Sequence, residues 1–130
     1  MAATGQENPR VLDVLAGEAE KTSETPYGTV GLLYAGPGIR AEWVSKRGEA
    51  IDPGWFTQDV VDFICVVAGK LRVEFEREDI APRTLGSGQV MILPPGVRCR
   101  AYSWPRETLN TAIFLAVYPA ADGLSHGQVG

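Results

Sequence analysis

Hydrophobic and polar residues alternate along much of the chain, and this alternation predicts short β-strands. Between residues 70 and 77, Leu71, Val73 and Phe75 alternate with charged residues, as in a strand with one face in the core and the other in water. Segments rich in glycine and proline separate this run from others rich in β-branched and aromatic residues. The predicted strands cover residues 29–34, 39–45, 59–67, 70–77, 89–93, 97–104 and 111–118.

Two of these runs do not alternate. Residues 60–67 (VVDFICVV) and 112–118 (AIFLAVY) are apolar on nearly both faces, whereas only one face of a small antiparallel fold meets the interior. Their outer faces therefore need a cover. A second subunit is the simplest cover and predicts a homodimer. The alternative is that the N-terminal helix or loop lies over these strands.

The predicted strands form one domain, residues 29–118. Residues 1–28 are expected to be an extension, disordered at its start and helical over about 9–19, because Asn8-Pro9 offers an N-cap and a proline at the first helical position. A strand is the alternative for this segment. Residues 20–27 are predicted to be a loop, and residues 119–130 a flexible tail.

Composition and charge fit an ordinary soluble protein. The 130 residues suffice for one domain, and 15 glycines and 9 prolines spread without a period favour many tight turns. A net charge of −4 gives no electrostatic basis for binding nucleic acid. No apolar run approaches the length of a membrane span, and the first residues lack the pattern of a signal peptide. We therefore expect a cytoplasmic protein with neither a nucleic-acid nor a membrane partner.

The histidine and cysteine counts limit the possible chemistry. The one histidine, His126, lies in the C-terminal tail, so a cluster of imidazoles in the core is excluded. Cys65 and Cys99 belong to no CxxC pair. In a reducing compartment, two buried thiols are favoured over a disulfide.

A recognisable motif runs from residue 88 to residue 103 (GQVMILPPGVRCRAYS). Pro94 and Gly96 suit a tight turn, because proline fixes φ and glycine supplies a positive φ. The segment resembles the second motif of the cupin superfamily, G-x5-P-x-G-x2-H-x3-N, with Cys99 at the histidine position and Ser103 at the asparagine position.

The first cupin motif, G-x5-H-x-H-x(3,4)-E-x6-G, fits more loosely. Asp62 lies at the position of the family's glutamate, before Gly69, and Phe56 and Gln58 take the two histidine positions. The run 55–62 (WFTQDVVD) is similar to that of small single-domain bacterial cupins of the cupin 2 type, or conserved barrel. The resemblance implies an all-β fold, a jelly-roll β-barrel or sandwich, here with a short N-terminal helix.

The same resemblance bears on metal binding. Metal-dependent cupins hold the ion with three histidines and a glutamate, and those positions are here Phe56, Gln58, Asp62 and Cys99. Phenylalanine cannot ligate, and the neutral carbonyl oxygen of glutamine is a poor ligand for transition metals. We therefore predict no metal and no other cofactor. A divalent transition metal held by Gln58, Asp62 and Cys99 is the alternative.

Without a metal, the interior suits a pocket for a small polar molecule. Asp62, in a mostly apolar strand, is the candidate catalytic acid or base, and the alternative is a structural carboxylate. Glu42 would add a second carboxylate nearby if the strand register turns it inward. The candidate ligand-binding residues are Glu42, Trp55, Phe56, Gln58, Asp62 and Cys99.

The fold alone does not select a function, because cupins host enzymes, storage proteins and sensors. The leading hypothesis is a metal-free homodimer that binds a small molecule. One alternative is an enzyme, either an isomerase, epimerase or cyclase that uses Asp62, or a divergent metalloenzyme. Another is a non-catalytic sensor or interaction module whose outer apolar sheet contacts another protein.

Overall fold

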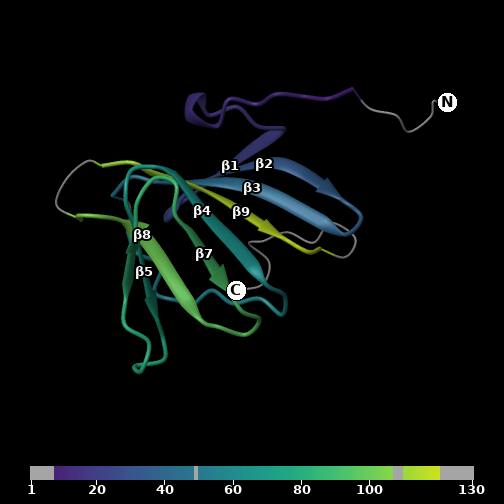
Figure 1. The fold of residues 1–130 in the computed structure, drawn as a ribbon. Coiled ribbons are helices and arrows are strands. Elements are labelled where there is room, and N and C mark those ends of the chain that lie inside the picture. The colour runs from purple at the N-terminus through teal and green to yellow at the C-terminus, as the bar shows by residue number, and fades with distance from the viewer. Residues whose placement is uncertain (1–7, 49, 107–109, 121–130) are drawn as a thin grey trace.

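The computed structural model describes residues 8–48, 50–106 and 110–120, and their strands form two antiparallel sheets (Figure 1). The large sheet contains, in spatial order, β1 (Lys21–Thr25), β2 (Gly28–Gly36), β3 (Ile39–Lys46), β9 (Ala112–Tyr118), β4 (Asp62–Ala68) and β7 (Val90–Leu93). The small sheet contains β6 (Arg83–Leu85), β5 (Leu71–Phe75) and β8 (Cys99–Ser103). The all-β prediction is confirmed.

The last strand of the described residues, β9, lies inside the large sheet. β9 pairs with β3 on one side and with β4 on the other, so Leu115 is the register partner of both Trp43 and Cys65. This arrangement places β3, from the first half of the sequence, directly beside β9. It also places the inward residues of β3, β9 and β4 in shared rows across the sheet.

The core lies between the two sheets and follows from the alternation in the sequence. On β5, Leu71 and Val73 are fully buried, as the alternating pattern predicts. β4 turns Asp62, Ile64 and Val66 inward, so the apolar run 60–67 has one buried face. The buried cluster comprises Val44, Ile64, Val66, Leu71, Val73, Leu85, Leu93, Cys99, Ala112, Phe114 and Ala116.

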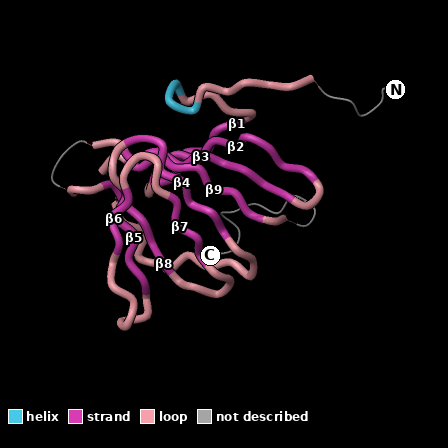
Figure 2. Tube along the Cα trace, in the orientation of Figure 1, coloured by secondary structure: helices cyan, strands magenta, loops and turns pink. Residues whose placement is uncertain are grey.

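The N-terminal segment differs from the prediction. The helix expected over about 9–19 is absent from the described residues of this segment, which contain only a 3₁₀ turn, η1 (Val14–Ala16), capped by Asp13 (Figure 2). Val11 is 94% exposed, so no apolar stripe is buried that would stabilise a helix here. Within the described residues, no helix is long and apolar enough to cross a membrane. Residues 1–7 and 121–130, which include His126, lie outside the described part.

The loop predicted for residues 20–27 is also wrong, because β1 forms there. Its five residues are all exposed, and it joins the sheet through backbone pairing with β2. The short strand β6 was likewise not predicted, and it borders β5 in the small sheet. Both are edge strands; β1 has only exposed side chains, and β6 has three residues, of which only Leu85 is buried, so neither shows an apolar alternation.

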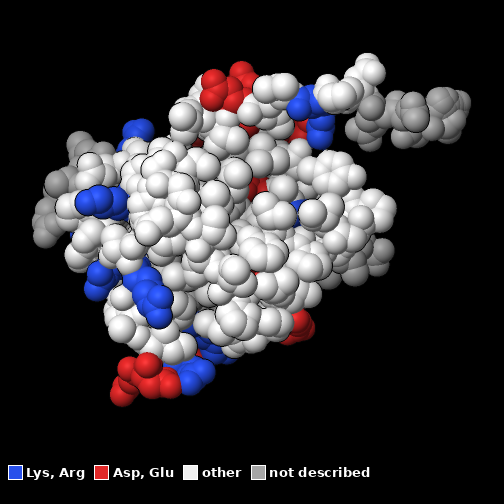
Figure 3. Space-filling model, viewed as in Figure 1, with Lys and Arg blue, Asp and Glu red and all other residues white. Residues whose placement is uncertain are grey.

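The outer face of the large sheet is partly covered. Near β3, the N-terminal segment crosses it, and the Trp43 indole donates a hydrogen bond to the Glu18 carbonyl (2.8 Å). On β4 and β7, however, Phe63, Val90 and Ile92 are 40%, 53% and 61% exposed. The surface over these two strands is largely uncharged (Figure 3). The predicted homodimer, which would cover this surface, stays a prediction.

Candidate functional site

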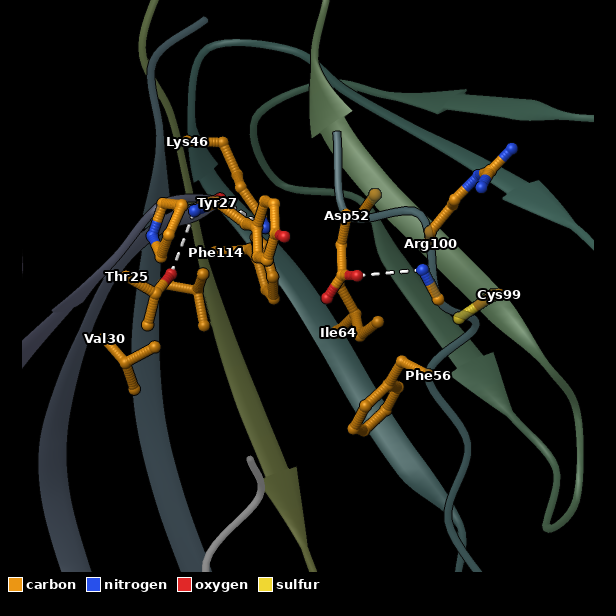
Figure 4. A pocket seen from close by; sticks show the side chains of 14 residues that line it. Thr25, Tyr27, Val30, Lys46, Asp52, Phe56, Ile64, Cys99, Arg100 and Phe114 are labelled. Carbon is orange, nitrogen blue, oxygen red and sulfur yellow. Dashed lines mark hydrogen bonds between the residues drawn. The ribbon is translucent and has the colours of Figure 1, made fainter. Parts of the chain in front are cut away.

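A cavity of about 380 Å³ lies between the two sheets and is open at one side (Figure 4). Its wall combines the turn between β1 and β2, the inner faces of β2, β3, β4 and β9, the loop before β4, and β8. The lining residues are Thr25, Pro26, Tyr27, Val30, Val44, Lys46, Asp52, Gly54, Phe56, Ile64, Cys99, Arg100, Ala101 and Phe114.

Most of the lining is apolar. Val44 and Phe114 come from neighbouring strands of the large sheet, and Ile64 continues the same surface on β4. Across the cavity, Phe56 and Cys99 are joined by a pair of backbone hydrogen bonds of 2.7 and 2.9 Å. These bonds attach the loop before β4 to the small sheet, so the cavity has a wall on each side.

Polar groups gather at the mouth of the cavity. The Lys46 ammonium donates a hydrogen bond to the Tyr27 carbonyl (2.8 Å). Asp52 Oδ1 accepts a hydrogen bond from the backbone N–H of Gly54 (2.8 Å), which fixes the turn at the start of the loop. The Arg100 side chain points away from the cavity in Figure 4. The cavity therefore combines an apolar interior with a charged entrance.

The Cys99 thiol belongs to the apolar wall. Burial raises its pKa to about 12, and the negative charge of Asp62 adds to the shift. The thiol is consequently protonated at neutral pH. Because the thiolate is the nucleophilic form, Cys99 is poorly suited to act as a nucleophile.

A second group of polar side chains is buried deeper in the barrel. Asp62 is 1% exposed and accepts a hydrogen bond from the Gln58 amide (3.1 Å). Glu42 is also buried; it pairs with Arg40 (3.0 Å) and accepts a hydrogen bond from the Tyr118 hydroxyl (3.4 Å). Burial, together with the nearby carboxylates, raises the pKa of Tyr118. Both carboxylates thus face inward. Of the two registers that were possible for the strand of Glu42, the structure has the one that turns Glu42 toward the interior.

The structure divides the predicted site residues into three groups. Phe56 and Cys99 line the cavity. Gln58 and Asp62 form a buried pair outside this lining, and Glu42 also lies outside it. Trp55, a candidate ligand-binding residue, does not line the cavity; its ring stacks on the Arg100 guanidinium, whose Cζ lies 4.1 Å from the ring centre.

Sequence reasoning missed the residues that close the cavity from the N-terminal side. Tyr27 and Lys46 belong to this group, as does Val30 on β2. Their role depends on the position of the β1–β2 turn. Since β1 itself carries no apolar alternation, the sequence has no local signal for that position.

The residues at the metal-binding positions of metal-dependent cupins do not fit a transition metal. Phe56 offers no donor atom, and Gln58, whose neutral amide is a poor ligand for a transition metal, donates a hydrogen bond to Asp62. In residues 8–48, 50–106 and 110–120, no group of three or more His, Cys, Asp or Glu side chains is placed to hold a metal ion.

Comparisons with known proteins bear on the fold. No family model matches the chain, and no curated protein matches its sequence. Among solved structures, an uncharacterized conserved protein with a double-stranded β-helix domain from Klebsiella pneumoniae subsp. pneumoniae superposes with a TM-score of 0.69 at 12% identity, over 90% of this chain and 95% of that one.

Two further structures are cupins by name. A cupin 2 conserved barrel domain protein from Salinispora arenicola gives a TM-score of 0.64 at 16% identity, covering 90% of this chain and 92% of that one. An RmlC-like cupin from Shewanella frigidimarina gives 0.62 at 15% identity, covering 78% and 85%. At these identities the likeness concerns the fold alone. The predicted architecture is thereby confirmed, and this chain folds as the double-stranded β-helix of the cupins.

Proposed function

We propose that this protein binds a small molecule in the cavity between its two sheets. The observation that carries the proposal is the cavity itself, about 380 Å³ in volume and walled on both sides by side chains from different strands. This volume lies within the range of small-molecule sites, which combine apolar walls with a few polar groups. The ligand is therefore small, with an apolar body and a polar end.

Binding is favoured over turnover by the position of the ionisable groups. Asp62, the candidate acid or base, does not line the cavity, and its partner Gln58 does not either. On β4, Ile64 is the residue that faces the ligand space. The protonated thiol of Cys99 supplies no nucleophile. A catalytic role for Asp62 would require the ligand to extend beyond the residues that line this cavity.

A fluorescence titration with N-phenyl-1-naphthylamine, a neutral apolar probe, tests the proposal. Ala101 lines the cavity, so Ala101→Leu places extra carbon atoms in the ligand space. Ala35→Leu is the matched control, because Ala35 is exposed on β2. We expect saturable binding to the wild type and to Ala35→Leu, and about tenfold weaker binding to Ala101→Leu.

Two outcomes would overturn the proposal. One is the absence of saturable binding to the wild type. The other is equal affinity for the wild type and Ala101→Leu, which would place the probe on another surface, such as the exposed outer face of β4 and β7. Circular dichroism of each variant confirms that the fold is retained.

A further inference from the structure

We infer that two copies of this chain associate through β7, whose open edges pair antiparallel and join the two large sheets into one. β7 is the last strand in the order of the large sheet. One of its sides pairs with β4, and the other borders no strand in the part of the chain that the structure describes. No residue of β7 lines the cavity, so this interface is separate from the proposed ligand site.

The backbone groups of Val90 and Ile92 point to the open side of β7. The Val66 N–H donates to the Gln89 carbonyl (3.0 Å), which makes Gln89 a hydrogen-bonded position opposite β4. Such positions alternate in an antiparallel pair, so Met91 is again bonded to β4, whereas Val90 and Ile92 are not. Each of these two residues therefore presents an N–H and a C=O at the edge.

An antiparallel second copy is the partner that these groups fit. If the two-fold axis passes beside Met91, Val90 of one copy lies opposite Ile92 of the other, and Ile92 lies opposite Val90. Each of these two pairs then exchanges two N–H···O=C bonds, so the edge groups of both residues find partners in both copies. The contact is isologous and closed, which favours a dimer over a longer chain of copies.

The side chains of β7 continue an apolar surface across this pairing. Ile92 and Val90 are 61% and 53% exposed. Their register partners on β4, Phe63 and Cys65 respectively, lie on the same outer face. In the joined sheets, the row of Phe63 and Ile92 is extended by Val90 and Cys65 of the second copy. Exposed aliphatic side chains thus cover each other, and the burial of apolar surface adds to the backbone bonds.

The other edge strands are less suited to self-pairing. β1 carries Lys21 and Glu24, and β6 carries Arg83. At the remaining edge, Cys99 of β8 is bridged to Phe56. Charged side chains on an edge strand disfavour pairing with another chain, and β7 (VMIL) has neither a charged residue nor a proline. A second copy therefore brings one uncharged edge against another, without like-charge repulsion.

Sedimentation equilibrium of the full chain over a series of concentrations tests the inference. Ile92→Pro removes the N–H at the open edge and leaves the bonds between Met91 and β4 in place. Ile92→Val is the matched control, because valine is apolar and similar in size to proline but keeps the N–H. We expect a wild-type dimer, and a dissociation constant at least tenfold larger for Ile92→Pro than for Ile92→Val.

Disulfide formation under mild oxidation tests the register. The variants carry Cys65→Ser, because Cys65 is the register partner of Val90 and would compete. A mixture of Val90→Cys and Ile92→Cys proteins should form a cross-linked dimer, since Cα atoms of a hydrogen-bonded pair lie about 5.5 Å apart. Either protein alone should not, because like residues are diagonal neighbours about 7–8 Å apart. Tyr34→Cys, at an exposed position of β2, replaces Val90→Cys in the collision control.

Three results would overturn the inference. One is a wild type that stays monomeric up to about 0.5 mM, which is the result expected if another segment of the same chain covers β7. The second is an Ile92→Pro protein that dimerises as tightly as Ile92→Val. The third is cross-linking that is equally efficient in the single-variant samples or in the collision control. The cross-linking pattern decides the matter even if Ile92→Pro fails to fold.

Discussion

Gly31 on β2 lies directly under the indole ring of its register partner, Trp43 on β3. A Cβ at position 31 would lie 2.1 Å from Trp43 Cε2 and 2.4 Å from Nε1, well inside the closest approach of real atoms. Trp43 is only 4% exposed, and its Nε1–H donates to the Glu18 carbonyl. We therefore predict that Gly31→Ala displaces the indole and loosens the N-terminal segment.

The size of this effect follows from three contributions. Forcing an extra methyl group into a packed site costs about 1–3 kcal/mol, and losing the indole hydrogen bond costs about 1 kcal/mol. Because the φ of Gly31 is accessible to alanine, the reduced entropy of the unfolded chain returns about 0.4–1 kcal/mol. The expected net loss in the free energy of unfolding is about 2 kcal/mol.

Urea unfolding followed by circular dichroism measures this loss. Gly86→Ala is the matched control, since a Cβ at Gly86 meets nothing closer than 3.9 Å. Adding Trp43→Leu to the Gly31→Ala variant should restore part of the stability, with a coupling energy of about 1 kcal/mol or more. The reasoning is refuted if Gly31→Ala is as stable as the wild type, or if the two substitutions are simply additive.

Three further predictions concern other parts of the molecule. Because burial raises the pKa of Cys99 from 9.0 to about 12, the unfolded state releases the thiol proton at lower pH than the folded state does. Between pH 9 and 11, the free energy of unfolding should therefore fall more steeply in the wild type than in Cys99→Ala, by about 1.4 kcal/mol per pH unit. Parallel curves for the two proteins would contradict this. Glu42→Gln removes the charged partner of Arg40 in a buried ion pair, so urea unfolding should show a loss of about 3 kcal/mol in the free energy of unfolding. A loss below about 1 kcal/mol would contradict this reasoning. If a second copy covers the outer face of β4 and β7, light scattering should give the mass of a dimer for the wild type and that of a monomer for Phe63→Asp. A monomeric wild type would contradict the dimer prediction.

The strands that could be predicted from the sequence are those with a local signal. In β5, the alternation of Leu71, Arg72 and Val73 was sufficient, because each side chain reports the face on which it lies. β1 (KTSET) has no such signal, since it is held at the sheet edge by backbone pairing with β2. The pair Asn8-Pro9 suggested a helix, but the capping pattern had no buried apolar stripe to support it.

The site was predictable to a similar extent. The motif spacing made Gln58, Asp62 and Cys99 candidate residues, and all three are buried, but of the three only Cys99 lines the cavity. The position of the cavity could not be predicted, because it depends on where the β1–β2 turn and the loop around Asp52 meet the sheets. Lys46, which follows the predicted strand 39–45, was therefore not among the candidate residues, although its hydrogen bond to the Tyr27 carbonyl places it at the entrance.

The central position of β9 has a consequence for how the protein is made. β3 and β4 do not pair with each other in the large sheet, and β9 is the strand that joins them. On the ribosome, both strands emerge long before the strand that belongs between them, so neither can complete its backbone pairing. Folding is thus delayed until β9 has emerged from the ribosome. A nascent chain that stops before residue 112 would expose two unpaired strand edges and depend on chaperones to stay in solution.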